Sequence, residues 1–312
     1  MPAVLASVLL AGGGLTPVDP DSPNTERIAD LYWFIAFWAA LVLLSVAVPL
    51  VLFLVRYRSR GRSREIEGPQ IHGSTRLEIA WTAVPVVILV IVAVFTFYKL
   101  PGITLAAGAG ERVTKIQVDG RQFYWHYRYP NGVIAIDKLR APADRLVELE
   151  ITAPADDVIH SYWAPDLFPK LDAIPGQTNT TEFRAGPGTY RGQCVEFCGL
   201  LHAEMLAEIE LIPPEQFDSW LAQQARAQET GQSDLGAQEF NGVCAKCHGA
   251  KGQGFIGPGL TPGTVANAAS VEQIVRNGRG KMPAVGADWD ERQMKALTDY
   301  LKTRFPGGAS GG

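Results

Sequence analysis

Residues 194–205 read CVEFCGLLHAEM, and this stretch holds four side chains that bind soft metal ions. They are the thiols of Cys194 and Cys198, the imidazole of His202 and the thioether of Met205. Sulfur and imidazole ligands favour copper or zinc over hard cations such as magnesium. Ligands packed this densely on one loop need a rigid frame, and the flanking sequence predicts what that frame is.

Around this loop, residues 110–213 have the pattern of short strands. Apolar and polar residues alternate at 147–152 and again at 208–211, as expected for strands with one buried face. Turn sequences such as Pro-Asn-Gly at 130–132 and Gly-Pro-Gly at 186–188 separate the strands. About a hundred residues of this kind predict a small all-β sandwich or Greek-key domain.

One further histidine is expected to complete the metal site. Of the other histidines, His72 follows an arginine-rich loop and His248 belongs to a second cysteine motif. His126, in RQFYWHYRY, is expected to be a half-exposed strand residue. His160, between strand signals in DDVIHSYW, is therefore the expected ligand.

Two thiolates on one loop can bridge two copper ions, which then share an unpaired electron. A tetrahedral Cys2His2 zinc site is an alternative, although zinc has no redox chemistry and no use for Met205. Two disulfides outside the cytoplasm are another alternative, which leaves the spacing of His and Met unexplained. A redox motif downstream favours copper.

That motif is CAKCH at residues 244–248, the pattern for covalent heme c. Cys244 and Cys247 would bind the heme and His248 would ligate its iron, although a redox dithiol or half a zinc site shares the C-x-x-C spacing. Only Met282 and Met294 lie downstream. Met294 shares a helical stripe with leucines and is expected in the core, so Met282, in the loop GRGKMPAVG, is the predicted sixth ligand.

The N-terminal third of the chain is predicted to cross a membrane twice. Residues 31–55 and 79–98 contain no Asp, Glu, Lys or Arg, and each run is long enough for a bilayer about 30 Å thick. Two buried helices of a soluble protein are the alternative. We expect a hairpin over residues 26–100, with helices at about 31–56 and 78–99.

The apolar run 3–11 in the N-terminal segment 1–25 is a candidate signal peptide, although no Lys or Arg precedes it.

Five arginines at positions 56, 58, 60, 62 and 64 mark the connecting loop as cytoplasmic and in contact with lipid. Both termini are then outside. Of 28 Lys and Arg, 28 − 5 = 23 remain against 32 Asp and Glu. The rest of the chain therefore offers no basic surface for nucleic acid.

The C-terminal region resembles class I cytochrome c. Gly236 and Phe240 stand before the heme motif at that family's spacing, and Tyr300 would be their partner on the last helix. The resemblance implies that the Pro258 carbonyl, in the loop at 257–260, accepts a hydrogen bond from His248. This domain would carry single electrons.

The whole chain is similar to subunit II of heme-copper cytochrome c oxidases of the caa type, in which a cytochrome c domain is fused at the C-terminus. The pattern C-x-E-x-C-x-x-x-H-x-x-M after an upstream His carries the likeness. It implies a dinuclear copper centre bound by His160, Cys194, the carbonyl of Glu196, Cys198, His202 and Met205. The Glu196 carboxylate would reach a magnesium ion shared with subunit I.

The resemblance implies a multidomain membrane protein. A transmembrane hairpin (26–100) precedes an all-β cupredoxin-like Greek-key copper domain (110–213), a helical linker (214–234) and an all-α cytochrome c domain (235–305). Glu78 corresponds to the family's proton entrance, and an ordinary helix-start acid is the alternative. Asp157 and Asp172 fall where the family faces subunit I, or stabilise turns.

One position departs from the family pattern. Phe123 replaces the usual tryptophan at the electron entry, beside Tyr124 and Trp125, and strand packing is the alternative role of all three. We expect a tethered heme domain to reach the copper by another contact. A tether gives the heme domain a roughly millimolar effective concentration at the copper domain. The encounter between the two domains would then not need a specialised docking surface.

The expected function is electron entry into a terminal oxidase. Electrons would pass from heme c to the dinuclear copper and on to a heme of subunit I, where oxygen is reduced. Expected partners are subunits I and III, membrane lipid, and a donor such as a quinol-cytochrome c reductase complex or another cytochrome c. The expected location is a bacterial inner or plasma membrane with both metal domains outside. A copper and heme c subunit of a nitric oxide reductase is the alternative.

Overall fold

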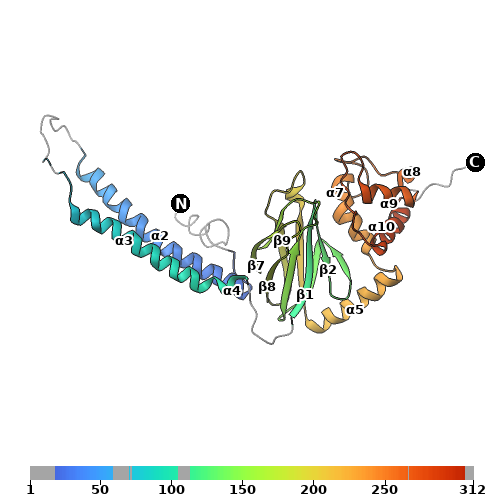
Figure 1. The fold of residues 1–312 in the computed structure, drawn as a ribbon, viewed down its shortest axis with the longest axis horizontal. Helices are drawn as coiled ribbons and strands as arrows, with labels where there is room; N and C mark the ends of the chain where they lie inside the picture. Colours follow the sequence, from blue (N-terminus) through green and yellow to red (C-terminus); the bar gives the residue numbers. More distant parts are fainter. Residues whose placement is uncertain (1–17, 59–69, 71, 105–112, 266, 306–312) are drawn as a thin grey trace, which may run out of the picture.

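The computed structural model describes residues 18–58, 70, 72–104, 113–265 and 267–305 of the 312-residue chain. A helical hairpin, a β-sandwich and a small helical domain follow one another along its long axis (Figure 1). This order confirms the fold class expected from the sequence. The candidate signal peptide and Arg60, Arg62 and Arg64 lie outside the described residues.

The hairpin consists of α2 (Pro23–Arg56) and α3 (Thr75–Lys99), followed by the short α4 (Pro101–Thr104). The first helix starts before the uncharged run because Ser22 and Thr25 form a capping box at its N-terminus. The Asn24 amide donates hydrogen bonds to the carbonyls of Ile103 and Glu182, at 2.7 and 2.9 Å. These polar first residues therefore anchor the hairpin to the β-sandwich.

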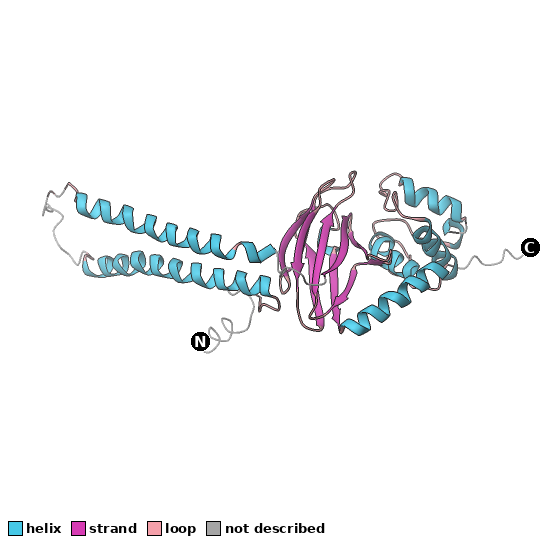
Figure 2. Cartoon of the chain, turned by 60° about the horizontal axis from the view of Figure 1, so that its bottom comes forward, coloured by secondary structure: helices cyan, strands magenta, loops and turns pink. Residues whose placement is uncertain are grey.

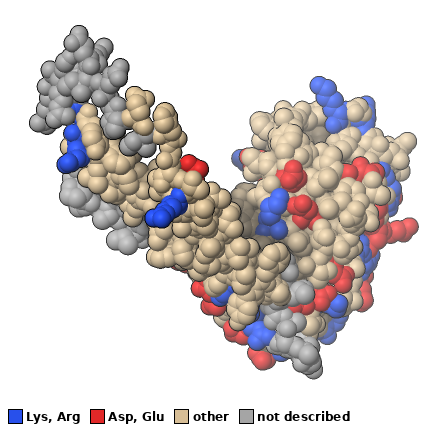
Figure 3. All heavy atoms as spheres, turned by 60° about the vertical axis from the view of Figure 1, so that its left-hand side comes forward, with Lys and Arg blue, Asp and Glu red and all other residues tan. Residues whose placement is uncertain are grey.

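Between its ends, the hairpin presents an apolar surface. Most of its surface atoms in Figure 3 belong to uncharged residues, whereas acidic and basic groups cover the outer domains. Phe34 stacks on Phe95 with ring centroids 4.0 Å apart, and Lys99 pairs with Asp30 at 2.6 Å near the outer end. Both helices are long and apolar enough to cross a membrane.

The sandwich consists of two five-stranded sheets, with strand orders β3-β2-β1-β5-β8 and β4-β10-β9-β6-β7 (Figure 2). The strands are β1 Val113–Arg121, β2 Tyr124–Arg128, β3 Ile134–Ile136, β4 Lys138–Pro142, β5 Leu146–Thr152, β6 His160–Ala164, β7 Phe168–Ala173, β8 Asn179–Phe183, β9 Gly188–Cys194 and β10 Leu206–Ile212. The parallel pairs β1–β5 and β4–β10 join non-consecutive strands among antiparallel neighbours, and this crossing is typical of Greek-key folds.

Strand ends bring the metal-binding side chains together. His160 is the first residue of β6 and Cys194 the last of β9, and these strands pair through Tyr162 and Cys194. The loop from β9 to β10, with the 3-10 turn η1 (His202–Glu204), returns over this end of the sheet. Beneath it, the fully buried rings of Trp125 and Tyr162 pack 4.4 Å apart.

The linker helix packs on the sandwich. Helix α5 (Pro214–Thr230) buries Phe217 against Tyr129. The Gln228 side chain bonds to both the N–H and the carbonyl of Ile134, at 3.0 and 2.7 Å, on the open edge of β3. The region expected as a helical linker, 214–234, thus contains α5, and these contacts hold it on the sheet.

The C-terminal domain is helical. Its elements are α6 Leu235–Glu239, the π-helical turn η2 Phe240–Cys244, α7 Ala245–His248, α8 Pro262–Val265, α9 Ala268–Asn277 and α10 Glu291–Arg304. The segment that leads into the heme motif thus contains a π-helical turn, which ends on Cys244, the first cysteine of the motif. Phe240 packs on Tyr300 with ring centroids 5.5 Å apart, as the cytochrome c resemblance implies.

Gly236 sits where α6 crosses α10. A Cβ atom at this position would lie 2.1 Å from the carbonyl oxygen of Ala296, so that the helices would have to separate. We expect Gly236→Ala to lower the free energy of unfolding by about 3 kcal/mol, measured by thermal unfolding of the full chain. Gly263→Ala in α8 is the control, because its nearest atom is 4.0 Å away. Equal losses in both variants would contradict the crossing argument.

Candidate functional site

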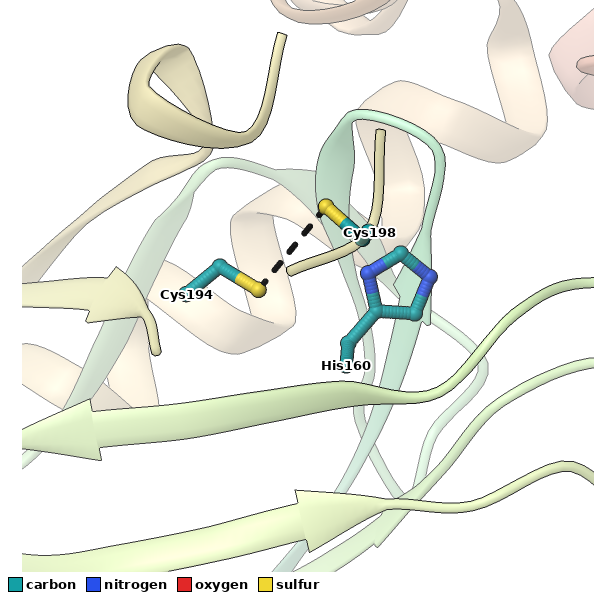
Figure 4. A group of neighbouring side chains, drawn as sticks. All are labelled: His160, Cys194 and Cys198. Atoms are coloured by element: carbon teal, nitrogen blue, oxygen red, sulfur yellow. Dashed lines mark hydrogen bonds between the residues drawn. The ribbon is translucent and has the colours of Figure 1, made fainter. Parts of the chain in front are cut away.

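Five sulfur and nitrogen donors converge at one end of the sandwich. The ligand atoms of His160, Cys194 and Cys198 lie within 4.8 Å of one another, and all three residues are buried (Figure 4). The Cys198 sulfur is the centre of the group. It lies 4.0 Å from the Cys194 sulfur, 3.6 Å from His202 Nδ1 and 3.9 Å from the Met205 sulfur.

Both cysteines of this loop are free thiols. Their separation of 4.0 Å is about twice the S–S bond length, which excludes a disulfide between them. The Cys198 thiol beside it, with His160 and nearby backbone groups, lowers the pKa of Cys194 to about 3. This shift favours the thiolate of Cys194, the form that binds metals, whereas the nearby Cys194 sulfur and burial raise the pKa of Cys198.

Asp157 orients His160. One carboxylate oxygen lies 3.1 Å from His160 Nε2, and the other accepts the N–H of Gln122 at 3.1 Å. His160 Nδ1 is buried and has no hydrogen-bond partner among the described residues, and it remains available to bind a metal. Burial disfavours the charged ring, but Asp157 and Cys194 together raise the pKa of His160. An outer carboxylate on a ligating histidine fixes its tautomer, a role that the sequence reasoning did not assign to Asp157.

Glu196 contributes two different groups. Its backbone carbonyl oxygen lies 3.3 Å from the Cys194 sulfur, beside the other donors. Its half-exposed carboxylate points away and lies 3.8 Å from Lys170 Nζ. Asp172 pairs with the same lysine at 3.3 Å and accepts the Ser161 hydroxyl at 2.7 Å. Among the described residues, the Glu196 carboxylate thus pairs with Lys170 and does not join the sulfur donors.

The number of donors discriminates between metals. A structural zinc takes four ligands, whereas His160, Cys194, Cys198, His202, Met205 and the Glu196 carbonyl offer six. The donors present exceed what one structural zinc ion would need, and they would suffice for two copper ions.

The second cysteine motif has the features of a heme site. Cys244 and Cys247 are free, and the buried His248 donates from Nδ1 to the carbonyl of Pro258 at 2.7 Å. This bond leaves Nε2 for an iron ion. A Cβ atom on Gly257 would lie 2.8 Å from the His248 ring, so this loop needs glycine to lie flat on the imidazole. These residues fit the heme c group that the motif implies.

The two candidate methionines differ in their surroundings. Met294 is 3% exposed and belongs to the core of the C-terminal domain. Met282 is half-buried and lies in a tight turn, in which its N–H donates to the Arg279 carbonyl at 3.1 Å. The structure therefore agrees with a core role for Met294.

The side chains of the aromatic run 123–125 contact three different parts of the protein. The Phe123 ring lies beside Gly199 of the loop 194–205. Tyr124 is fully buried among residues of the C-terminal domain, and its hydroxyl accepts the indole N–H of Trp289 at 3.1 Å. Trp125 is buried in the sandwich with its ring centroid 6.3 Å from that of His160. The run therefore touches both domains.

His126 is buried, and the expectation of a half-exposed residue is wrong. It is 1% exposed because the C-terminal domain covers the outer face of β2 and places Gln293 3.5 Å from its ring. Burial lowers the pKa of His126, although Asp119, at 3.3 Å from Nδ1, opposes the shift. Strand alternation cannot reveal this contact, since the covering domain comes much later in the chain.

One further expected residue, Glu78, and two unexpected ones, Gln122 and Lys246, complete the description. Glu78 lies in the exposed first turn of α3, where its N–H donates to the Ser74 carbonyl at 3.0 Å. Sequence reasoning missed Gln122, whose side chain donates to the Cys198 carbonyl at 2.6 Å. It also missed Lys246, which lies between the heme-motif cysteines and contacts the sandwich. Neither residue type gives a sequence signal of its own.

Three family models match the chain. The model described as cytochrome c oxidase subunit II, transmembrane domain, matches residues 13–98, and the periplasmic domain of the same subunit matches residues 132–212. Residues 231–301 match the model described as cytochrome c oxidase, cbb3-type, subunit III. The matches follow the three regions of the fold.

Whole-chain relatives carry the same description. Cytochrome c oxidase subunit 2 of Alkalihalophilus pseudofirmus is 32% identical and covers 93% of this chain and 90% of its own. The probable cytochrome c oxidase subunit 2 of Rickettsia bellii is 33% identical over 69% of this chain and 85% of its own. The crystal structure of the periplasmic domain of subunit II from Bradyrhizobium japonicum aligns with a TM-score of 0.35 and 30% identity, over 36% of this chain and 94% of that one.

Proposed function

This chain belongs to the cytochrome c oxidase subunit II family, and from that premise we propose how its residues carry out electron entry. It is an electron-transfer subunit of a terminal oxidase, with a copper domain and a heme domain outside a two-pass membrane anchor. Oxygen reduction takes place in another subunit of the complex. The observation that carries the proposal is the convergence of donors on Cys198.

The copper site is a dinuclear centre held by six donors. Cys194 and Cys198 would supply two thiolates, and His160 and His202 two imidazoles, to a pair of copper ions. Met205 and the Glu196 carbonyl are the weak ligands. When bound, the copper pair and the heme each take up and release one electron. Asp157 holds the His160 ring, and the buried sandwich core beneath keeps water away from the centre.

In the heme domain, Cys244 and Cys247 would hold the porphyrin and His248 would bind the iron. The Pro258 carbonyl keeps the imidazole in the tautomer that leaves Nε2 free. Met282 would supply the sixth ligand. A thioether ligand favours the reduced iron and so raises the reduction potential of the heme.

The aromatic run provides the path between the two domains. Tyr124 reaches Trp289 in the heme domain, and Trp125 lies against the copper ligand His160. Phe123 packs on Gly199 of the copper-binding loop. An electron can thus cross from one domain to the other along packed side chains, without an encounter in solution.

Several assignments rest on the family resemblance. The Glu196 carboxylate is proposed to bind magnesium at the contact with subunit I, where it would exchange Lys170 for the ion. Glu78 is proposed as a proton entrance on the cytoplasmic side. Subunit III is a further proposed partner. A quinol-cytochrome c reductase complex or another cytochrome c is the proposed donor.

The purified complex tests this function. We expect it to contain a larger polytopic subunit, to consume oxygen, and to show a near-infrared copper band with a mixed-valence spin signal. Uptake of nitric oxide without oxygen would favour the reductase alternative, which the relatives described above do not support. A colourless outer domain with a single zinc ion would contradict the copper assignment.

A further inference from the structure

The copper and heme domains share a buried contact outside both metal sites. Tyr124, Ile134 and Ile136 of the sandwich belong to the same apolar core as residues of the heme domain, namely Leu235, Phe240, Val243, Trp289, Met294 and Leu297. Gly242 permits the closest approach, since a Cβ atom there would lie 2.5 Å from the Ile136 side chain. The helix that leads into the heme motif therefore lies directly on β3.

Two ion pairs lie at this contact. Arg121 of β1 makes a bidentate pair with Asp288, just before α10. Lys246 pairs with Asp137 at 2.6 Å and donates to the Phe123 carbonyl at 2.8 Å. Lys246 is distinct because it stands between the two cysteines of the heme motif, and its side chain is only 16% exposed. A shielded pair with an additional hydrogen bond holds its geometry better than an exposed one.

Asp137 connects Lys246 to the strand that carries Trp125. Its backbone N–H donates to the Trp125 carbonyl at 2.9 Å, and its Oδ1 accepts the Trp125 N–H at 2.8 Å. The second oxygen, Oδ2, remains for the Lys246 ammonium. Asp137 has a φ of 56°, a left-handed conformation that Asp and Asn adopt more readily than most residues. One carboxylate thus holds both the strand and the heme motif.

The other partner of Lys246 leads to the copper-binding loop. Gln122, next to Phe123, donates from its side chain to the Cys198 carbonyl at 2.6 Å. The Gln122 N–H donates to the Asp157 carboxylate, which holds His160. Lys246 is therefore connected to the copper ligand Cys198 through two hydrogen bonds and the backbone between Phe123 and Gln122.

We propose that Lys246 is the positioning residue that fixes the heme motif on the copper domain, through the Asp137 carboxylate and the Phe123 carbonyl. This inference rests on the proposed electron-transfer function. One electron leaves the reduced heme iron and enters the copper pair, with no proton or bond transferred. Lys246 does not react, but it sets the separation over which the electron must pass.

Lys246→Met tests this role in the full-length protein within its complex. Methionine keeps an unbranched apolar chain but loses the charge and all three donors. We expect electron transfer from heme to copper to slow by at least about tenfold. This factor corresponds to the free energy lost when a hydrogen bond to a charged group is removed. The rate is followed optically after flash reduction of the heme. Amide exchange in the segment 134–137 should become faster, while the heme and copper spectra stay unchanged.

Asp137→Asn probes the same contact from the other domain. Asparagine accepts the left-handed backbone and can still bind the Trp125 N–H, so only the ionic partner of Lys246 is lost. We expect it to slow transfer as Lys246→Met does, and the double variant to be no slower than the slower single one. Lys251→Met is the control, because Lys251 is an exposed lysine near the heme motif.

Wild-type transfer rate and wild-type amide exchange in Lys246→Met would overturn the proposal, as would an equal slowing in Lys251→Met. Additive effects of Lys246→Met and Asp137→Asn would also overturn it, since they would show that the two side chains act independently. If the purified wild-type complex contained no copper or no heme, the proposed electron-transfer function itself would be contradicted. The exchange measurement would still report on the Lys246 contact in that case, so the two failures are distinguishable.

Discussion

Cys198→Ser is expected to abolish the dinuclear copper centre. The Cys198 sulfur contacts Cys194, His202 and Met205, so that one substitution removes the atom around which the donors gather. A serine hydroxyl remains protonated at neutral pH and is a hard ligand, which cannot bridge two copper ions. We expect at most one copper ion per chain, no near-infrared band and no mixed-valence signal. Oxygen reduction should fall by more than about a hundredfold, beyond the loss typical of outer-shell changes.

Leu200→Ala provides the matched control for Cys198→Ser. Leu200 lies in the same loop, is 76% exposed, and has no donor atom in its side chain. Its copper content and spin signal should equal those of the wild type. A Cys198→Ser variant that keeps both copper ions and the mixed-valence signal would show that the sulfur is not a bridging ligand. Copper analysis with spin resonance on the purified complex makes this comparison.

The sequence could predict which candidate copper and heme donors lie together because each motif is local. Cys194, Cys198, His202 and Met205 lie within one loop, and their spacing alone indicates that they can meet. His160 was found by elimination among five histidines, and the structure brings it to the same cluster. The alternation of apolar residues predicted a sandwich, because each sheet must bury one face.

What the sequence could not predict depends on contacts between distant segments. The burial of His126 requires α10, and the role of Lys246 requires β3 and its following turn. The start of α2 at Pro23 depends on polar bonds to the sandwich, which a search for uncharged runs does not detect. The sequence predicted a helical linker at 214–234, but it gave no sign of the contacts of Gln228 and Phe217 that fix this linker on the sheet.

Met282→Ala is expected to lower the reduction potential of the heme by on the order of 100 mV or more, because axial ligands set potentials over a wide range. Loss of a thioether ligand removes a group that favours reduced iron and leaves the sixth position open, which changes the spin state. Met282 lies in the turn closed by the backbone bonds between Arg279 and Met282, so truncation of its side chain leaves this turn intact. Potentiometric titration and optical spectra of the purified complex measure both effects.

Met294→Ala separates the ligand role from a packing role, since it removes the same side chain from the core of the same domain. Met294 is 3% exposed and packs among Leu297 and other apolar residues. Its truncation should cost about 2–5 kcal/mol of unfolding free energy, as for other buried large-to-small changes. The heme potential and spin state should remain those of the wild type, because the iron keeps both axial ligands. If Met294→Ala shifts the potential while Met282→Ala only lowers the melting temperature, the core methionine is the ligand and the tight turn at 279–282 serves packing instead.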